Sequence, residues 1–302
     1  MSDIVEPVPH PHHRHGWWWK TLLAGLGLWI LTIIITALTS NANLIPTLIL
    51  LGSFLVPFCV VLFVIERVTG GVSTLQLVLL FFVGGIFGVL GASLLEVNLQ
   101  PSLWTFIGVG FIEEFVKALI LIIGGRRVTP RTPAQGALLG ATVGAGFAAF
   151  ESAGYAFNAA ISAQGINLIS LLQTEVLRAI LAPVGHIVWT AIIGAVLFGA
   201  ARWVSRIRWV LAVVVTYVVV ALLHGLWDSM NFISSILALV FTGDLTIVLE
   251  RGFLPATAAA EVTALATTLY VVGLAIVAAA ALLILWRILR RARTPREGAS
   301  QT

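Results

Sequence analysis

Eight apolar stretches of about 20 residues each follow one another along the chain, separated by short polar segments. A helix of that length rises ~30 Å, the thickness of the hydrocarbon core of a bilayer. It also satisfies its own backbone hydrogen bonds, which lipid cannot do. The sequence therefore predicts an all-α, polytopic membrane helix bundle of about eight transmembrane helices. The predicted spans are 21–39, 44–65, 75–95, 103–123, 136–160, 176–200, 209–230 and 262–286.

The composition excludes most other classes of protein. Hydrophobic residues make up 59% of the chain and charged residues 10%, against ~25% charged residues in an ordinary soluble domain. A soluble domain of this length could not bury so much apolar surface. The net charge of +4 comes from short clusters between the apolar stretches. Such clusters report orientation in a lipid bilayer, so no nucleic-acid partner is expected.

These basic clusters orient the predicted bundle. With the N-terminus inside, 14 of the 17 Lys and Arg residues fall in cytoplasmic segments, in agreement with the positive-inside rule. We therefore expect a multi-pass protein of the cytoplasmic membrane with both termini in the cytoplasm. Residues 1–20 are expected to form a flexible, His-rich cytoplasmic tail, residues 21–286 the integral membrane domain, and residues 287–302 a basic cytoplasmic tail.

Ionisable residues inside spans are confined to the middle four. Burial of charge in lipid is costly, so such residues indicate a functional site. They are Glu113, Glu114 and Lys117 in the fourth span, Glu151 in the fifth, His186 in the sixth, and His224 with Asp228 in the seventh. At the helical rise, Glu113 and His186 lie ~15 Å from the outer ends of their spans, and Glu151 and His224 lie ~22 Å from the inner ends. One shared pocket between spans four to seven is therefore expected.

Spacing within each span indicates local pairs. Residues three or four apart share a helix face, so Lys117 can pair with either glutamate and hold it ionised. The two glutamates point ~100° apart, which lets only one of them face a given centre. Glu151 and Tyr155 are four residues apart, and a tyrosine can donate to a carboxylate. His224 and Asp228 have the same spacing, which suits two ligands of one ion or a carboxylate that orients an imidazole.

Two imidazoles and several carboxylates fit the hydrolysis of a peptide bond. Zn²⁺ held by such groups with one open position activates a water and stabilises an oxyanion, while a nearby glutamate accepts the proton. Serine chemistry fits less well because the chain has no G-x-S-x-G. The H-E-x-x-H motif is also absent.

At these positions the sequence resembles the PrsW family of intramembrane proteases, which is related more distantly to the type II CAAX-processing (Abi) membrane proteases. The matching motifs are EEFVK from Glu113 to Lys117, FAAFESAGY from Phe147 to Tyr155, the isolated His186, and HGLWD from His224 to Asp228. The CAAX-type relatives have a histidine at the position of Glu151. A glutamate at this position is what is expected of the PrsW branch. The motifs lie in this order on four separate spans, so the resemblance covers about half of the chain.

The resemblance implies a membrane-embedded metalloprotease that cleaves other membrane proteins near their extracytoplasmic face, with anti-sigma factors as the known substrate type and Zn²⁺ as the expected ion. Carried over to this chain, Glu113 or Glu114 is the general base, with Glu113 favoured, and Lys117 pairs with the other. The implied ligands of the ion or of the attacking water are Glu151, His186 and His224, with Asp228 as a fourth ligand or as the partner of a ligand.

Two other functions use the same residue types. A chain of Glu, His and Asp inside spans also builds a proton relay, so a proton- or ion-coupled transporter is the alternative, although neither internal repeats nor broken-helix signals support it. A non-catalytic scaffold would use the cluster only to hold helices together. Outside the cluster, Glu175 and Arg178 are expected to be solvated charges at the outer surface. Residues 232–242 are apolar but too short to span, so a re-entrant or interfacial segment is expected there.

Overall fold

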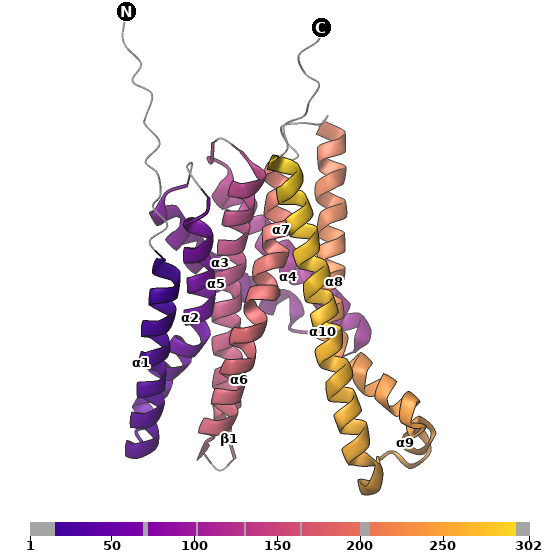
Figure 1. Cartoon of the computed structure of the whole chain (residues 1–302). Coiled ribbons are helices and arrows are strands. Elements are labelled where there is room, and N and C mark those ends of the chain that lie inside the picture. Colours follow the sequence, from indigo (N-terminus) through magenta and orange to yellow (C-terminus); the bar gives the residue numbers. More distant parts are fainter. Residues whose placement is uncertain are drawn as a thin grey trace, which may run out of the picture.

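A computed structural model of the chain describes residues 16–68, 72–100, 102–129, 131–163, 165–199 and 206–293. The described part is a bundle of long helices (Figure 1) with one pair of two-residue antiparallel strands, β1 (Ile161–Ser162) and β2 (Gly165–Ile166). The helices are α1 (Trp17–Thr39), α2 (Ile45–Ile65), α3 (Thr74–Glu96), α4 (Leu103–Gly125), α5 (Pro133–Ala160), α6 (Leu168–Leu181), α7 (His186–Gly199), α8 (Arg206–Thr242), α9 (Leu245–Arg251) and α10 (Ala256–Arg293), with 3-10 turns η1 (Ala42–Leu44) and η2 (Ala182–Val184). The prediction of an all-α polytopic bundle is confirmed.

Within the described residues, seven helical segments are long and apolar enough to cross a membrane. They correspond to all the predicted spans except the fourth, and they make the chain a multi-pass membrane protein. Helix α4 has 23 residues and is long enough. Unlike the seven segments, it carries three charged side chains near its middle, those of Glu113, Glu114 and Lys117. A full crossing by α4, and with it the count of eight spans, stays a prediction.

The starts of the helices around the site are fixed by local capping. Ser102 accepts from the backbone N–H of Thr105, whose hydroxyl in turn accepts from the backbone N–H of Ser102, a reciprocal arrangement that satisfies two free donors at the start of α4. Thr132 caps α5, and Pro133 follows it at the first helical position, where a missing N–H costs nothing. These caps fix the residues at which α4 and α5 begin.

The sixth predicted span is broken. Helix α6 ends at Leu181, the 3-10 turn η2 follows, and Gly185 leaves helical geometry before α7 begins at His186. Pro183 lacks a backbone N–H, and its ring prevents an uninterrupted helix. The expectation of one continuous helix over 176–200, without a broken-helix signal, is therefore wrong. The break places His186 at the first residue of a helix in the interior of the bundle.

Helices α8 and α10 are longer than predicted. Residues 232–242 continue α8 instead of forming a re-entrant segment, because neither proline nor glycine occurs between Leu226 and Thr242. The helix ends at Thr242 and is followed by Gly243, which has a positive φ of 80°. The first residues of the predicted basic tail belong to α10, and the end of the predicted N-terminal tail belongs to α1. The tail histidines at 10–15 and residues 294–302 lie outside the described residues.

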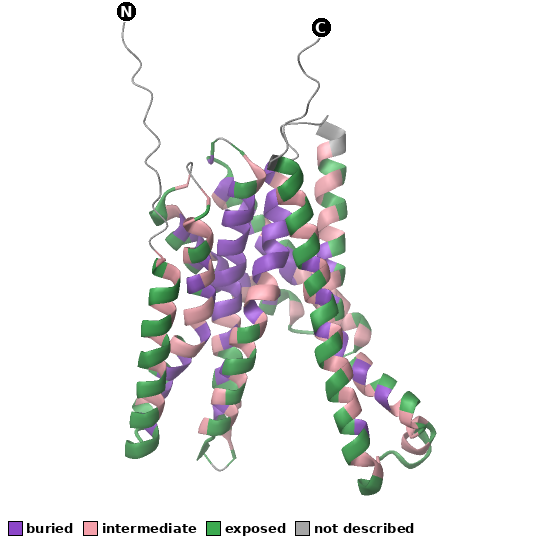
Figure 2. Ribbon diagram, viewed as in Figure 1, coloured by how far each residue is buried: buried purple, intermediate pink, exposed green. Residues whose placement is uncertain are grey.

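Close backbone contacts at glycines assemble the centre of the bundle, and two of them lie beside the ionisable residues. A side chain at Gly144 of α5 would collide with the backbone carbonyl of His186, so α5 and α7 touch directly there. A side chain at Gly110 of α4 would collide with the carbonyl of Ala221 on α8. Glycine at such contacts lets membrane helices approach closely. Buried residues are accordingly concentrated along α5 and α7, as Figure 2 shows.

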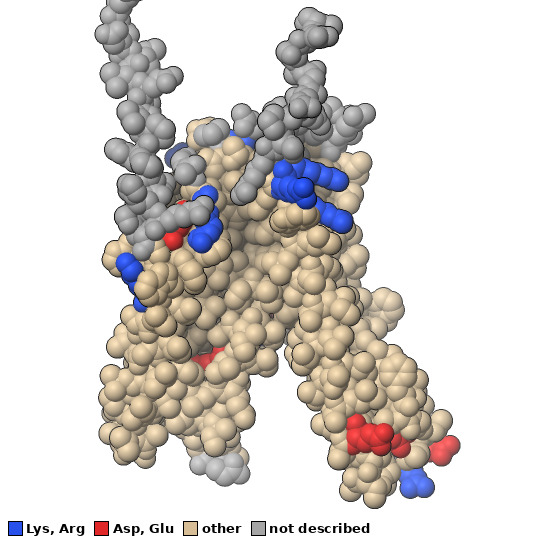
Figure 3. Space-filling view, viewed as in Figure 1, with Lys and Arg blue, Asp and Glu red and all other residues tan. Residues whose placement is uncertain are grey.

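The two ends of the bundle differ. The start of α1 and the end of α10 lie at the same end (Figure 1), and most of the Lys and Arg side chains visible in Figure 3 are gathered there. At the opposite end, the molecule is hollowed between an arm that contains α1, α2 and α6 and an arm formed by α8, α9 and α10 (Figures 1 and 3). Acidic side chains lie near the tip of the second arm.

Candidate active site

Helices α4, α5, α7 and α8 bring the ionisable residues of the middle spans together. Glu113 is the common neighbour of the two histidines: its Oε2 lies 3.8 Å from His186 Nδ1 and 3.6 Å from His224 Nε2. All three side chains are largely shielded from solvent. Three helices, α4, α7 and α8, therefore meet at Glu113, and the depth of this point in the membrane stays a prediction.

Lys117 lies at the centre of the cluster and is fully buried. Its Nζ is 2.6 Å from Glu114 Oε1 and 3.3 Å from Glu113 Oε2, so both predicted pairs form. The ammonium also lies 4.2 Å from the centre of the Phe147 ring, and this cation–π contact further stabilises the charged form of the lysine. Two buried carboxylates thus share one buried cation.

The hydrogen bonds of His186 fix its tautomer. Lys117 Nζ is 3.0 Å from His186 Nδ1, and because an ammonium group only donates, Nδ1 is the acceptor. The ring proton is then on Nε2, which donates to Glu151 Oε2 at 2.9 Å. Glu151 therefore holds the far side of the His186 ring, while Nδ1 faces Glu113.

His224 is held in the same manner from the other side. Its Nδ1 donates to Glu114 Oε1 at 3.1 Å, and the ring of Trp189 stacks on it with 4.4 Å between centroids. Its Nε2 lone pair then lies 3.3 Å from Asp228 Oδ2 and 3.6 Å from Glu113 Oε2. A lone pair and two carboxylate oxygens at such distances repel unless a proton or a cation lies among them.

The donor set fits a metal ion. Glu113, His186 and His224 each offer one ligand atom, and these atoms lie within 4.8 Å of one another. Ligands at the 2.0–2.1 Å typical of Zn²⁺ are about 3.4 Å apart in a tetrahedron, close to the 3.6 and 3.8 Å separations from Glu113. Each imidazole also donates its other N–H to a carboxylate, as metal-bound histidines do. Two more carboxylates lie beside this group: Glu151 contacts His186, and Asp228 contacts His224.

The expectation that Glu175 and Arg178 are solvated surface charges is wrong. Arg178 forms an ion pair with Glu151, donates from Nε to Ser152 Oγ at 2.8 Å, and covers the Tyr155 ring at 4.3 Å. Glu175 is only 2% exposed and accepts from Trp29 Nε1 at 2.8 Å. The reason is that both residues lie on α6, which begins at Leu168 and packs on α2 and α5.

A cavity of about 350 Å³ opens onto the cluster and is lined by Glu113, Glu151, Asp228, Tyr155 and Glu96. Glu96 was missed by sequence reasoning because it lies one residue beyond the predicted third span. Its Oε1 is buried and has no hydrogen-bond partner among the described residues. The only signal in the sequence was a carboxylate next to the end of an apolar stretch. Tyr155, expected as a donor to Glu151, lies beneath the Arg178 guanidinium instead.

Comparisons with curated proteins and with solved structures found no match. In a comparison with models of known protein families, residues 46–259 match the family described as PrsW family intramembrane metalloprotease. The matched region runs from α2 into α10 and includes the four helices that carry the cluster. It covers more than half of the chain. With the buried Glu, His and Lys residues described above, this match shows that the chain is a membrane-embedded peptide hydrolase that belongs to the PrsW family of intramembrane metalloproteases.

Proposed function

We propose that this protein hydrolyses peptide bonds of single-span membrane proteins, of the anti-sigma-factor type, with a water that a metal ion and Glu113 activate together. The observation that carries the proposal is the position of the Glu113 carboxylate. It faces a lone-pair nitrogen of each histidine and also lines the cavity through which a substrate would enter. A carboxylate within reach of both the ion and the substrate can take the proton of the attacking water.

The ion would be held by His186 Nδ1 and His224 Nε2, with Asp228, which lies 3.3 Å from His224 Nε2, as the carboxylate ligand in place of Glu113. Zn²⁺ is the ion that imidazoles and one carboxylate suit best. When bound, it polarises the peptide carbonyl and activates a water. His186 Nδ1 accepts from Lys117 in this structure, so an ion bound there would compete with the ammonium group for that nitrogen. Lys117 also has Glu113 and Glu114 as partners.

The remaining residues position these groups. Glu151 orients His186 and is itself held by Arg178, so we assign it to the support of a ligand instead of to the ion. Glu114 orients His224 in the same way. Outer partners of this kind fix the ring orientation and raise the basicity of the ligand nitrogen.

We also propose that the protein lies in the cytoplasmic membrane with both termini in the cytoplasm. Two observations support this orientation. The first and last described helices begin and end at the same end of the bundle (Figure 1), and basic side chains gather there (Figure 3). Basic residues accumulate on the cytoplasmic side of membrane proteins.

Cleavage and transport are separated by one experiment. The purified protein is reconstituted in vesicles with a panel of single-span membrane proteins that carry a fluorophore at each end. We expect two fluorescent fragments to appear from at least one panel member, and no proton flux when a pH gradient is imposed. Flux in the absence of any fragment would support the transporter alternative and contradict the proposal.

Metal content gives a second prediction. The purified protein should contain about one Zn²⁺ per chain, and His224→Ala should lose it, because three protein ligands are the usual minimum for a catalytic zinc site. Elemental analysis by mass spectrometry measures both. The four tail histidines, His10, His12, His13 and His15, are replaced by alanine in every sample so that ions bound to the tail do not count. Equal metal content with and without His224 would show that it is no ligand.

A further inference from the structure

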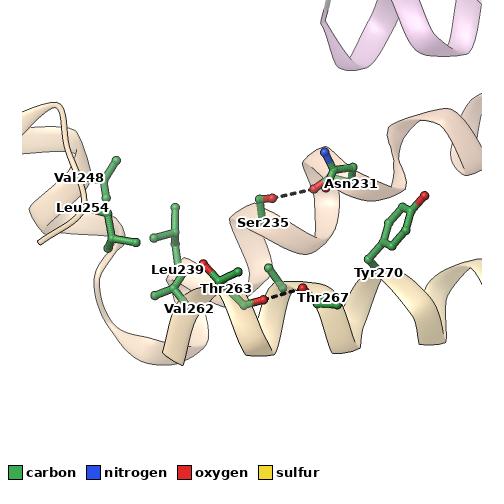
Figure 4. Close-up of a pocket in the computed structure, with 10 residues that line it drawn as sticks. Asn231, Ser235, Leu239, Val248, Leu254, Val262, Thr263, Thr267 and Tyr270 are labelled. Carbon is green, nitrogen blue, oxygen red and sulfur yellow. Dashed lines mark hydrogen bonds between the residues drawn. The ribbon is translucent and has the colours of Figure 1, made fainter. Parts of the chain in front are cut away.

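A second cavity lies between α8, α9 and α10, away from the cluster of acids and histidines. It encloses about 350 Å³, within the range of ligand-binding pockets. Figure 4 shows Asn231 and Ser235 on α8 opposite Thr263, Thr267 and Tyr270 on α10, with Leu254 near one end. We call this cavity the α8–α10 groove.

The groove is lined by polar groups on helices that are otherwise strongly apolar. The hydroxyls of Ser235 and Thr267 each donate at 2.8 Å to a backbone carbonyl one turn earlier in their own helix. Their oxygens therefore remain free to accept an N–H from a bound molecule. The exposed amide of Asn231 adds donors as well as an acceptor.

The groove continues the active-site face of α8. His224, Asp228, Asn231 and Ser235 follow one another at intervals of four, three and four residues, which is the spacing of one helix face. Asp228 lines the active-site cavity and Asn231 lines the groove, ~5 Å apart along the helix axis. From His224 to Ser235 the axis rises ~16 Å, the length of about five residues of extended chain.

The groove also lies at the depth where a membrane segment leaves the bilayer. Tyr270 is 17 residues and Thr263 is 24 residues before Arg287, the first arginine at the basic end of α10. At the helical rise these positions are ~26 Å and ~36 Å from that end, on either side of the far boundary of a ~30 Å hydrocarbon core. On the inner side of this boundary, backbone that is not helical needs hydrogen-bond partners from protein.

We propose that the α8–α10 groove is a substrate subsite that binds an extended, unwound stretch of the substrate within about five residues of the cleaved bond. A substrate helix must open before its peptide bond can reach Glu113, and its released N–H and C=O groups then need partners. Asn231, Ser235 and Thr267 supply these partners, and the apolar Leu239 and Val262 take a side chain. A lipid acyl chain could use only the apolar part of this lining and would offer no hydrogen bond to the hydroxyls and the amide. The inference rests on the proposed protease function.

The first test compares two substitutions on neighbouring residues of α10. Thr267 and Thr268 are both exposed, and both hydroxyls donate one turn back in the helix, but only Thr267 lines the groove. With the full-length protein in lipid nanodiscs and a cleaved single-span reporter, Asn231→Leu combined with Thr267→Val should raise KM about tenfold, because each lost hydrogen bond weakens binding several-fold. The kcat should stay within about twofold, and Thr268→Val should match the wild type. An unchanged KM in the double variant, with the wild type active, would overturn the subsite.

A second measurement does not depend on cleavage. A photoreactive benzoylphenylalanine replaces Ser235 in a Glu113→Gln background, and the protein is irradiated with each fluorescent single-span reporter in nanodiscs. The subsite predicts a crosslink to the reporter, and the crosslinked position should lie within a few residues of the cleavage site. Crosslinks to lipid alone would overturn the subsite even if the wild type is an active protease. Reporter crosslinks in the absence of any cleavage by the wild type would contradict the proposed function and leave the groove as a peptide-binding site.

Discussion

Glu113→Gln should lower kcat for cleavage of a single-span reporter by about 10²- to 10⁴-fold, the range that general-base catalysis contributes. Glutamine has almost the same shape, so the packing of α4 against α5 and α8 is kept. It cannot accept the proton of a water. Because Glu113 lines the cavity and faces both histidines, no other carboxylate in the described part of the chain shares its position. The measurement is initial-rate kinetics on purified protein in nanodiscs.

Metal content separates the two roles that Glu113 could have. If it is the base, Glu113→Gln keeps the bound Zn²⁺ of the wild type and loses only the rate. If it is a ligand, as its place in the Glu113, His186 and His224 group also permits, metal and rate are lost together. Glu175→Gln is the matched control, since that carboxylate is as buried but lies against Trp29 outside the cavity. A Glu113→Gln variant as fast as the wild type would show that the base is another group.

Lys117→Met should destabilise the folded protein by about 3–5 kcal/mol, the cost of removing one partner from a buried ion pair. Methionine keeps most of the volume of the side chain and removes the charge. Glu113 and Glu114 would then be left as buried carboxylates without their common cation, which lies 3.3 Å and 2.6 Å from them. Unfolding by denaturing detergent, followed by circular dichroism or tryptophan fluorescence, measures the change.

Two controls support the interpretation of the Lys117 result. Lys20→Met removes an exposed lysine that lies over Trp17 and Trp19, and it should leave the unfolding transition where it is. The double variant with Lys117→Met and Glu114→Gln removes one charge of each sign, so it should recover part of the lost stability. No recovery in the double variant would mean that Lys117 stabilises the protein by packing and not by charge.

The sequence alone determined the fold class and the ionisable residues that the middle spans contribute to the cluster. The length of each apolar stretch predicts a membrane helix because lipid leaves a chain no other source of backbone hydrogen bonds. Charge in lipid is so costly that each ionisable residue inside a span indicates a site. For this reason Glu113, Glu114, Lys117, His186 and His224 could be selected, and the count of residues along each helix placed them at one level.

What each of these residues does was decided by the tertiary structure. The partner of a buried group depends on which helices touch, and that depends on contacts such as Gly144 against His186. Hydropathy describes one helix at a time, so it could not reveal that Arg178 reaches back to Glu151 or that Pro183 breaks the helix just before His186. Hydropathy also could not reveal that Glu96 lines the active-site cavity, because that depends on how α3 packs against its neighbours. The residues of the site follow from the cost of burying charge, whereas the hydrogen bonds that orient them follow from packing between helices.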